Sequence, residues 1–324
     1  MYFVLQNIFF FMTNICIQIQ THTPHFHYTD TLVKSLLEKT NVLELNIPIF
    51  IVFDNLDMQN DYIDKYHYNT GVSYLNLIDM MGSLKLDINE KPEDRFKETI
   101  NTNWGIGGHR NHVAVKRTYS ILELEERGFT HVWCMDCESL VLRQTNLLPI
   151  IDANVLKPLL LVGKDCDGEK LPQIVIGVLQ QEFSESFERY NFRMNDFWFI
   201  HTRYFSDMIK MIFKLHNKPI SYFMKGSEQS VYENYLLYRY FLDENDVEIV
   251  EINNNLHNNV AFNQVINNTD IDIDTYAEEM NTTYFNKTMA FRGDYITSCM
   301  ESERGNELID KLNIQIAVSN YQGF

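Results

Sequence analysis

Hydrophobic positions in the first third of the chain change period from strand to helix and back. In NICIQIQ (14–20) isoleucines alternate with polar residues, which is the pattern of a strand. IPIFIVFDN (47–55) is an apolar run ending at Asp54, which suits a strand buried on both faces. Between the two runs lies a helical stripe of Leu32, Val33, Leu36 and Leu37. Strand, helix and strand in this order predict a parallel pair with a right-handed crossover.

The pattern continues with a third strand and a long helix. VSYLNLI (72–78) is the next strand candidate, and 111–127 has helical spacing with Gly128 as its stop. FTHVWCMD (129–136) is the strongest candidate for a buried strand in the chain. Segment 57–70 is expected to be helix or loop. Two polar segments are expected to be loops: 21–30, which contains Pro24, and 83–110.

The second half contains both kinds of element in a less regular order. Strands are predicted at 158–163, 173–180, 195–200 and 247–252. Helices are predicted at 182–190, 205–213, 227–241 and 303–312. We therefore expect one α/β domain over 14–324, with a first half at 14–140 and a second half at 141–324. Residues 1–13 form an apolar leader that is expected to lie outside this fold.

Composition narrows the class of protein. The chain has 324 residues, of which 45% are hydrophobic, and this is enough to form a full core. Lys and Arg number 27 against 44 Asp and Glu, so the net charge is 27 − 44 = −17. That charge argues against a general nucleic-acid binder, which must neutralise phosphates. Binding of a small anionic ligand together with a metal ion remains compatible with this net charge.

Cysteines and the N-terminus indicate the cellular compartment. Five cysteines are an odd and sparse set, which predicts reduced, mostly buried thiols. Residues 2–12 are apolar, but no basic residue precedes them and polar residues interrupt them. A signal peptide needs a basic segment before its apolar run, and a membrane-spanning helix needs about 18 or more apolar residues. A cytoplasmic protein is expected, and the alternative is a protein of the secretory pathway that is anchored in the membrane through 1–12. Met12 is a second candidate for the first translated residue.

The candidate chemistry lies at Asp136-Cys137-Glu138, at the end of the buried strand candidate 129–136. Ligands of open α/β sheets bind at the carboxyl ends of the strands. Two acids at i and i+2 on a turn there are expected to point into one crevice and to suit Mg²⁺ or Mn²⁺. The alternative is a solvated polar turn, because acidic pairs are common in a chain with 44 acids.

Four stretches together resemble the nucleotide-sugar-dependent glycosyltransferases of the GT-A fold. They are KRTYSILELEERGFTHVWCMDCES (116–139), THTPHF (21–26), FDN (53–55) and GSEQSVYENYL (226–236). The resemblance covers about 14–250, and Glu138 departs from the usual second Asp of the family's Asp-x-Asp motif. It implies a GT-A-like, mixed and mostly parallel sheet flanked by helices.

The resemblance implies roles for residues of the first half. Thr21 and His22 line the nucleotide, and Asp54 accepts a hydrogen bond from its base or ribose. Lys116 reaches a phosphate of the donor. Asp136 contacts the donor and, with Glu138, holds the metal. The non-functional alternatives are that Asp54 is an ordinary turn residue and that Lys116 lies on a solvated face of its helix.

For the second half, the resemblance implies an acceptor site. Glu228 or Asp196 activates the acceptor hydroxyl in an inverting enzyme, whereas a retaining enzyme needs no strong base. The alternative for Glu228 is a charge favourably placed at a helix N-terminus. His257 follows the last strand and is implied as a third metal ligand, with a polar surface loop as its alternative.

The predicted function is transfer of a sugar from a nucleotide-diphosphate sugar to a hydroxyl of a glycan, protein or small molecule. The cofactor is Mn²⁺ or Mg²⁺, and no nucleic-acid partner is expected. Alternatives are a non-catalytic sugar- or nucleotide-binding module and a sugar nucleotidyltransferase. Cys134-x-x-Cys137 is discounted as a redox pair because its thiols point to opposite faces of a buried strand. The spacing of His22, His25 and His27 is too irregular to predict a metal site.

Overall fold

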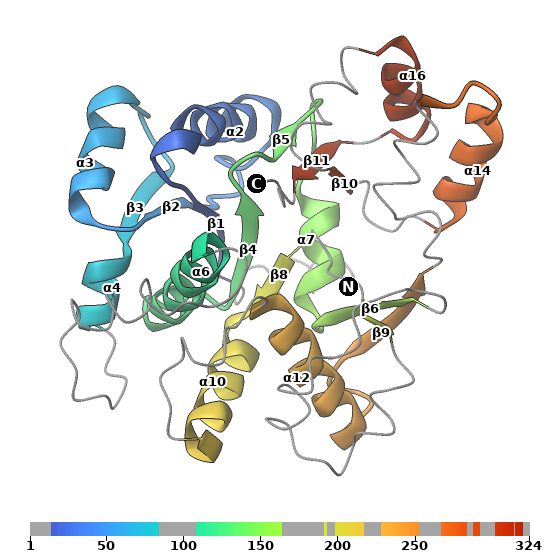
Figure 1. The fold of residues 1–324 in the computed structure, drawn as a ribbon. Coiled ribbons are helices and arrows are strands. Elements are labelled where there is room, and N and C mark those ends of the chain that lie inside the picture. The colour runs from blue at the N-terminus through green and yellow to red at the C-terminus, as the bar shows by residue number, and fades with distance from the viewer. Residues whose placement is uncertain are drawn as a thin grey trace, which may run out of the picture.

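A five-stranded, mostly parallel sheet forms the centre of the protein, as expected for an α/β fold (Figure 1). The computed structural model describes residues 14–83, 108–163, 191–192, 198–216, 228–252, 267–283, 288–291, 302–313 and 315–319. The central strands are β1 (Ile15–Gln20), β2 (Ile49–Phe53), β3 (Val72–Asn76), β4 (His131–Asp136) and β8 (Trp198–His201). Their order is β3-β2-β1-β4-β8, and only β8 runs antiparallel to its neighbour.

Each central strand divides its side chains between two cores, as the alternating pattern of β1 predicts. Ile15, Ile17 and Ile19 lie in one core, whereas Cys16 lies in the other. The first core includes residues of α2 (Phe26–Lys39), α3 (Leu56–Lys65) and α7 (Leu148–Val155). The second includes residues of α4 (Leu77–Ser83), α6 (Gly108–Glu126), α10 (Thr202–His216) and α12 (Glu228–Leu242). Helices therefore cover both faces of the sheet.

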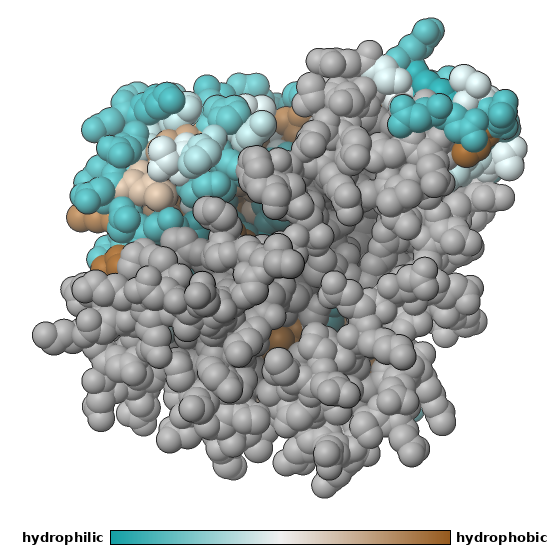
Figure 2. Space-filling model, in the orientation of Figure 1, coloured by the Kyte–Doolittle hydropathy of each residue, from teal (hydrophilic) through white to brown (hydrophobic). Residues whose placement is uncertain are grey.

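Two small sheets extend the structure beyond the central one. One has the order β10-β11-β5 and consists of β10 (Thr288–Phe291), β11 (Ile316–Ser319) and β5 (Leu140–Val141). The other has the order β7-β6-β9 and consists of β7 (Asn191–Phe192), β6 (Leu159–Gly163) and β9 (Glu248–Ile252). Two further helices are α14 (Ile273–Thr283) and α16 (Glu303–Lys311). In Figure 2, hydrophilic side chains gather over α2 and α3 at the upper left and over α14 and α16 at the upper right.

Most predicted elements in the described ranges are confirmed, and three boundaries or loops are corrected. The strand expected at 72–78 ends at Asn76, because α4 begins at Leu77. The loop expected at 83–110 is helical at both of its described ends, where α4 ends at Ser83 and α6 begins at Gly108. Segment 21–30 is not a loop, because η1 (Thr23–His25) and the start of α2 occupy it. Pro24 fits the first turn of η1, where no backbone N–H is needed. The leader 1–13 and the segments 84–107, 173–180 and 182–190 lie outside the described residues. The division into halves at residue 140 stays a prediction.

Gly128 ends α6, as its position in the sequence predicts. Its φ is 91°, a left-handed conformation that glycine adopts without strain. Its N–H donates to the Glu125 carbonyl at 2.8 Å, and the Phe129 N–H donates to the Leu124 carbonyl at 3.0 Å. These two bonds are those of a Schellman motif, which turns the chain from α6 into β4.

The strand order reverses at β1. The chain builds β1, β2 and β3 outward in one direction and then places β4 on the other side of β1. The carboxyl ends of β1 and β4 are therefore the switch point, where open α/β sheets bind ligands. None of the described helices is long and apolar enough to cross a membrane.

Two buried histidines face each other across β4 and β8. His131 pairs with His201 in the antiparallel register, and their ring centroids are 4.2 Å apart. Burial, followed by the positive charge of His201, lowers the pKa of His131 to about 3. The unfolded chain binds this proton below the ordinary pKa of 6.5, whereas the folded protein does not until about pH 3. Stability is therefore lost as the pH falls between these two values.

We predict that His131→Phe makes folding stability less sensitive to acid. Between about pH 7.5 and about pH 5, the wild type should lose roughly 2 kcal/mol through this group alone, and the variant should not. Urea unfolding at the two pH values measures the difference within each protein. His67→Phe replaces an exposed histidine and should keep the wild-type difference. Equal acid losses in wild type and His131→Phe would contradict the prediction.

Candidate functional site

Residues from two turns meet at the switch point. The first turn follows β1 and begins with Thr21 and His22, and the second follows β4 and contains Cys137 and Glu138. The parallel register pairs Gln20 with Asp136, so the two strands end side by side. The Ser139 N–H donates to the Asp136 carbonyl at 3.0 Å and closes the second turn. The acids are therefore held at the carboxyl edge of the central sheet.

Asp136 is held by a cation and an amide. The Arg117 guanidinium, which comes from α6, donates to Asp136 Oδ1 at 2.5 Å. Gln20 Nε2 at the end of β1 donates to the same oxygen at 3.3 Å. A charge-assisted bond of this kind orients the carboxylate as well as neutralising it. Asp136 therefore has a defined direction set by α6 and β1.

Glu138 turns to a different set of partners. Its carboxylate forms an ion pair with His25 Nδ1 from η1. It also accepts a bond from the Cys137 thiol, with Sγ 3.2 Å from Oε2. Burial acts to raise the pKa of Glu138, but the hydrogen bond and charge of His25 outweigh it and the pKa is lowered. Glu138 is therefore an ionised, largely enclosed carboxylate.

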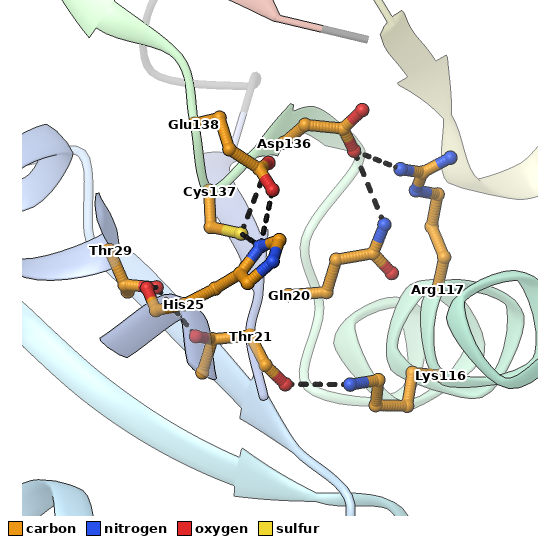
Figure 3. A network of polar contacts seen from close by, with 9 residues as sticks. All are labelled: Gln20, Thr21, His25, Thr29, Lys116, Arg117, Asp136, Cys137 and Glu138. Atoms are coloured by element: carbon orange, nitrogen blue, oxygen red, sulfur yellow. Dashed lines mark hydrogen bonds and ion pairs between the residues drawn. The ribbon is translucent and has the colours of Figure 1, made fainter. Parts of the chain in front are cut away.

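The two acids of the Asp-x-Glu pair diverge. In Figure 3 the Asp136 carboxylate is directed toward Arg117, whereas that of Glu138 is directed toward His25. The sequence predicts that both point into one crevice, and the structure gives each its own partners. Their shared role as metal ligands stays a prediction.

Lys116 joins α6 to the ends of two strands. Its ammonium donates to the Thr21 carbonyl at 2.6 Å and lies 2.7 Å from Asp54 Oδ1, which follows β2. Only 1% of Lys116 is exposed, so the interpretation as a solvated helix face is wrong. The structure thus brings together three residues that the resemblance implied around the nucleotide: Thr21, Asp54 and Lys116.

His22 lies at the same edge and packs against His25, with ring centroids 3.9 Å apart. Burial, followed by the positive charges of His25 and Lys116, lowers the pKa of His22 to about 4. Its imidazole is therefore neutral near pH 7. A neutral ring both donates and accepts hydrogen bonds, which suits contact with a nucleotide.

One group of side chains in the described ranges has the composition of a metal site. His25, Cys137 and Glu138 each offer a ligand atom, and these atoms all lie within 4.8 Å of one another. Burial, followed by the charges of Glu138 and Asp136, raises the pKa of the Cys137 thiol well above its ordinary value. Cys134 lies in the opposite core, so the two thiols of Cys134-x-x-Cys137 do face apart, as expected.

Three contact residues were absent from the expected site: Gln20, His25 and Arg117. His25 was among the three histidines of 21–30, but its position opposite Glu138 depends on the turn η1. Arg117 adjoins Lys116 in sequence, and the signal that would have singled it out is a second cation on the helix before the acidic turn. Asp196 and His257 lie outside the described residues, and α12 begins at Glu228 as predicted.

Comparison with known proteins gives structural likenesses only. No protein-family model matches the chain, and no curated protein matches it in sequence. Galactosyltransferase LgtC, solved with donor and acceptor sugar analogues, is 14% identical, with 95% of this chain and 87% of that chain covered and a TM-score of 0.42. Core-mannan synthase A from Aspergillus fumigatus, in a Mn/GDP form, is 11% identical, with 73% and 72% covered and a TM-score of 0.44.

A third similar structure is that of mouse xyloside xylosyltransferase 1. It is 6% identical, with 95% of this chain and 97% of that chain covered and a TM-score of 0.42. All three likenesses concern the path of the chain, and no residue's role is taken from them.

We predict that Lys116→Met destabilises the fold by about 3 kcal/mol, because it takes the positive charge from a buried carboxylate. Replacing both partners, as in Lys116→Met with Asp54→Leu, should cost less than the sum of the single changes. Denaturant unfolding of the two single variants and the double variant measures this coupling. Additive losses would contradict it.

Lys34→Met is the matched control for this prediction. Lys34 also lies 2.7 Å from a carboxylate, that of Asp30, but its side chain is 56% exposed. Water and salt screen such a pair, so its removal should change stability little.

Proposed function

We propose that this protein is a metal-dependent glycosyltransferase that moves a sugar from a nucleotide-diphosphate sugar to an acceptor hydroxyl. The observation that carries the proposal is the position of Asp136 and Glu138 at the switch point of the central sheet. Acids at this edge are well placed to bind a cation between the protein and a diphosphate. The resemblance of 116–139 to the GT-A motif supports the same conclusion.

The donor atoms suit Mn²⁺ or Mg²⁺. Asp136 and Glu138 supply carboxylate oxygens, which these hard cations prefer, and His257 is proposed as a third ligand. When bound, the ion neutralises the charge that develops on the diphosphate leaving group. The short bond from Arg117 orients the Asp136 carboxylate for that task.

The remaining contacts support binding of the nucleotide. Lys116 binds the Thr21 carbonyl and Asp54, so it links the residues that follow β1 and β2 at the proposed nucleotide site. Neutral His22 is proposed to contact the base or ribose. Arg117 adds a positive charge beside Asp136, which favours the anionic diphosphate.

The acceptor is proposed to bind against the second half of the chain. There Glu228, at the start of α12, or Asp196 takes the proton of the acceptor hydroxyl as the bond to the sugar forms. A glycan, protein or small-molecule hydroxyl is chemically equivalent at this step.

We predict that the full-length chain releases nucleotide from one donor sugar in the presence of Mn²⁺ and not in the presence of a chelator. Asp136→Asn should lower this rate by at least roughly 100-fold, as loss of one charge-stabilising group does in other enzymes. Release of free nucleotide from a panel of nucleotide sugars measures it. Asp152→Asn changes an exposed acid on α7 and should keep the rate.

Two other results would identify the alternatives. Thermal stabilisation by a nucleotide with Mn²⁺, but no release from any donor, would indicate a binding module without turnover. Formation of a nucleotide sugar from a sugar phosphate and a nucleoside triphosphate would indicate a nucleotidyltransferase.

A further inference from the structure

We propose that His25, Cys137 and Glu138 form a binding site for Zn²⁺ or a similar borderline cation. The site shares Glu138 with the proposed function but does not rest on it. Its three donors are an imidazole nitrogen, a thiol sulfur and a carboxylate oxygen, which is the ligand set of zinc rather than of magnesium.

The separations of the thiol sulfur from the other two donor atoms are close to those of tetrahedral coordination. Zinc–sulfur and zinc–nitrogen bonds of about 2.3 and 2.0 Å place the two ligand atoms about 3.5 Å apart. Cys137 Sγ lies 3.6 Å from His25 Nδ1 and 3.2 Å from Glu138 Oε2. His25 and Glu138 are in direct contact, so binding would require the imidazole and the carboxylate to move apart and to exchange their ion pair for bonds to the ion.

Burial and charge also suit a cation. His25 and Cys137 are buried, and the side chain of Glu138 is 10% exposed. On binding, the Cys137 S–H bond breaks, a metal–sulfur bond forms, and the proton passes to solvent together with any proton on His25 Nδ1. A thiolate and a carboxylate then balance the two charges of the ion in a site of low polarity.

The surrounding structure holds the donors in place. The Thr29 hydroxyl donates to the His25 carbonyl at 3.1 Å and lies 2.6 Å from the Thr21 hydroxyl, which fixes η1 against the end of β1 (Figure 3). Cys137 has no disulfide, and the other described free cysteines, Cys16 and Cys134, lie in the opposite core. The ion would therefore link the turn after β1 to the turn after β4 and leave a fourth position for water or a ligand oxygen.

We predict that the full-length wild type binds one Zn²⁺ per chain, and that Co²⁺ in its place gives a thiolate-to-cobalt charge-transfer band. Cys137→Ala should abolish the band and weaken Zn²⁺ binding by at least about 100-fold. Cys134→Ala removes a buried thiol from the opposite core and should keep both the cobalt band and the affinity for Zn²⁺. Titration calorimetry and absorption spectroscopy measure the two properties.

Several results would overturn the site. They are absence of the band in the wild type, its persistence in Cys137→Ala, or binding of Mn²⁺ without binding of Zn²⁺. If Cys137→Ala does not fold, His25→Gln tests the same site and should weaken Zn²⁺ binding in the same way. Asp136→Asn separates the two proposals, because it should stop nucleotide release and keep the cobalt band.

Discussion

The carboxyl edge of the central sheet, where the candidate site lies, depends on the contacts of the buried Lys116 ammonium. It joins α6 to the Thr21 carbonyl after β1 and to Asp54 after β2, and the side chain is almost fully enclosed. A buried charge is tolerated only where partners neutralise it. The position of α6 is thereby coupled to the ends of two strands. Arg117, the next residue, is carried by the same helix to Asp136.

The two acids of the turn after β4 have different environments. Asp136 faces α6 and has a guanidinium beside it, whereas Glu138 faces η1 and has an imidazole and a thiol beside it. The first environment suits an anionic diphosphate, and the second suits a borderline cation. The two proposals share Glu138, which would hold the hard cation together with Asp136, or the borderline cation together with His25 and Cys137. Both lie at the switch point of the sheet, where binding of either ligand would join the turns after β1 and β4.

Much of the fold was predictable because it follows local periodicity. Alternation in 14–20 marked β1, the apolar run before Asp54 marked β2, and Gly128 marked the end of α6. The turn η1 was missed because its polar residues carry no helical stripe, and its geometry depends on Pro24 and on packing against β1. The expected second half was only partly within the described residues.

The sequence by itself determined where the acidic turn lies, because a buried strand and the turn after it are encoded within a few adjacent residues. Only the tertiary structure decided which partners Asp136 and Glu138 have and that Lys116 is buried. Those outcomes depend on the register of β1 with β4 and on the rotation of α6 over the sheet. Both arise from packing between residues about a hundred positions apart, which no local pattern records.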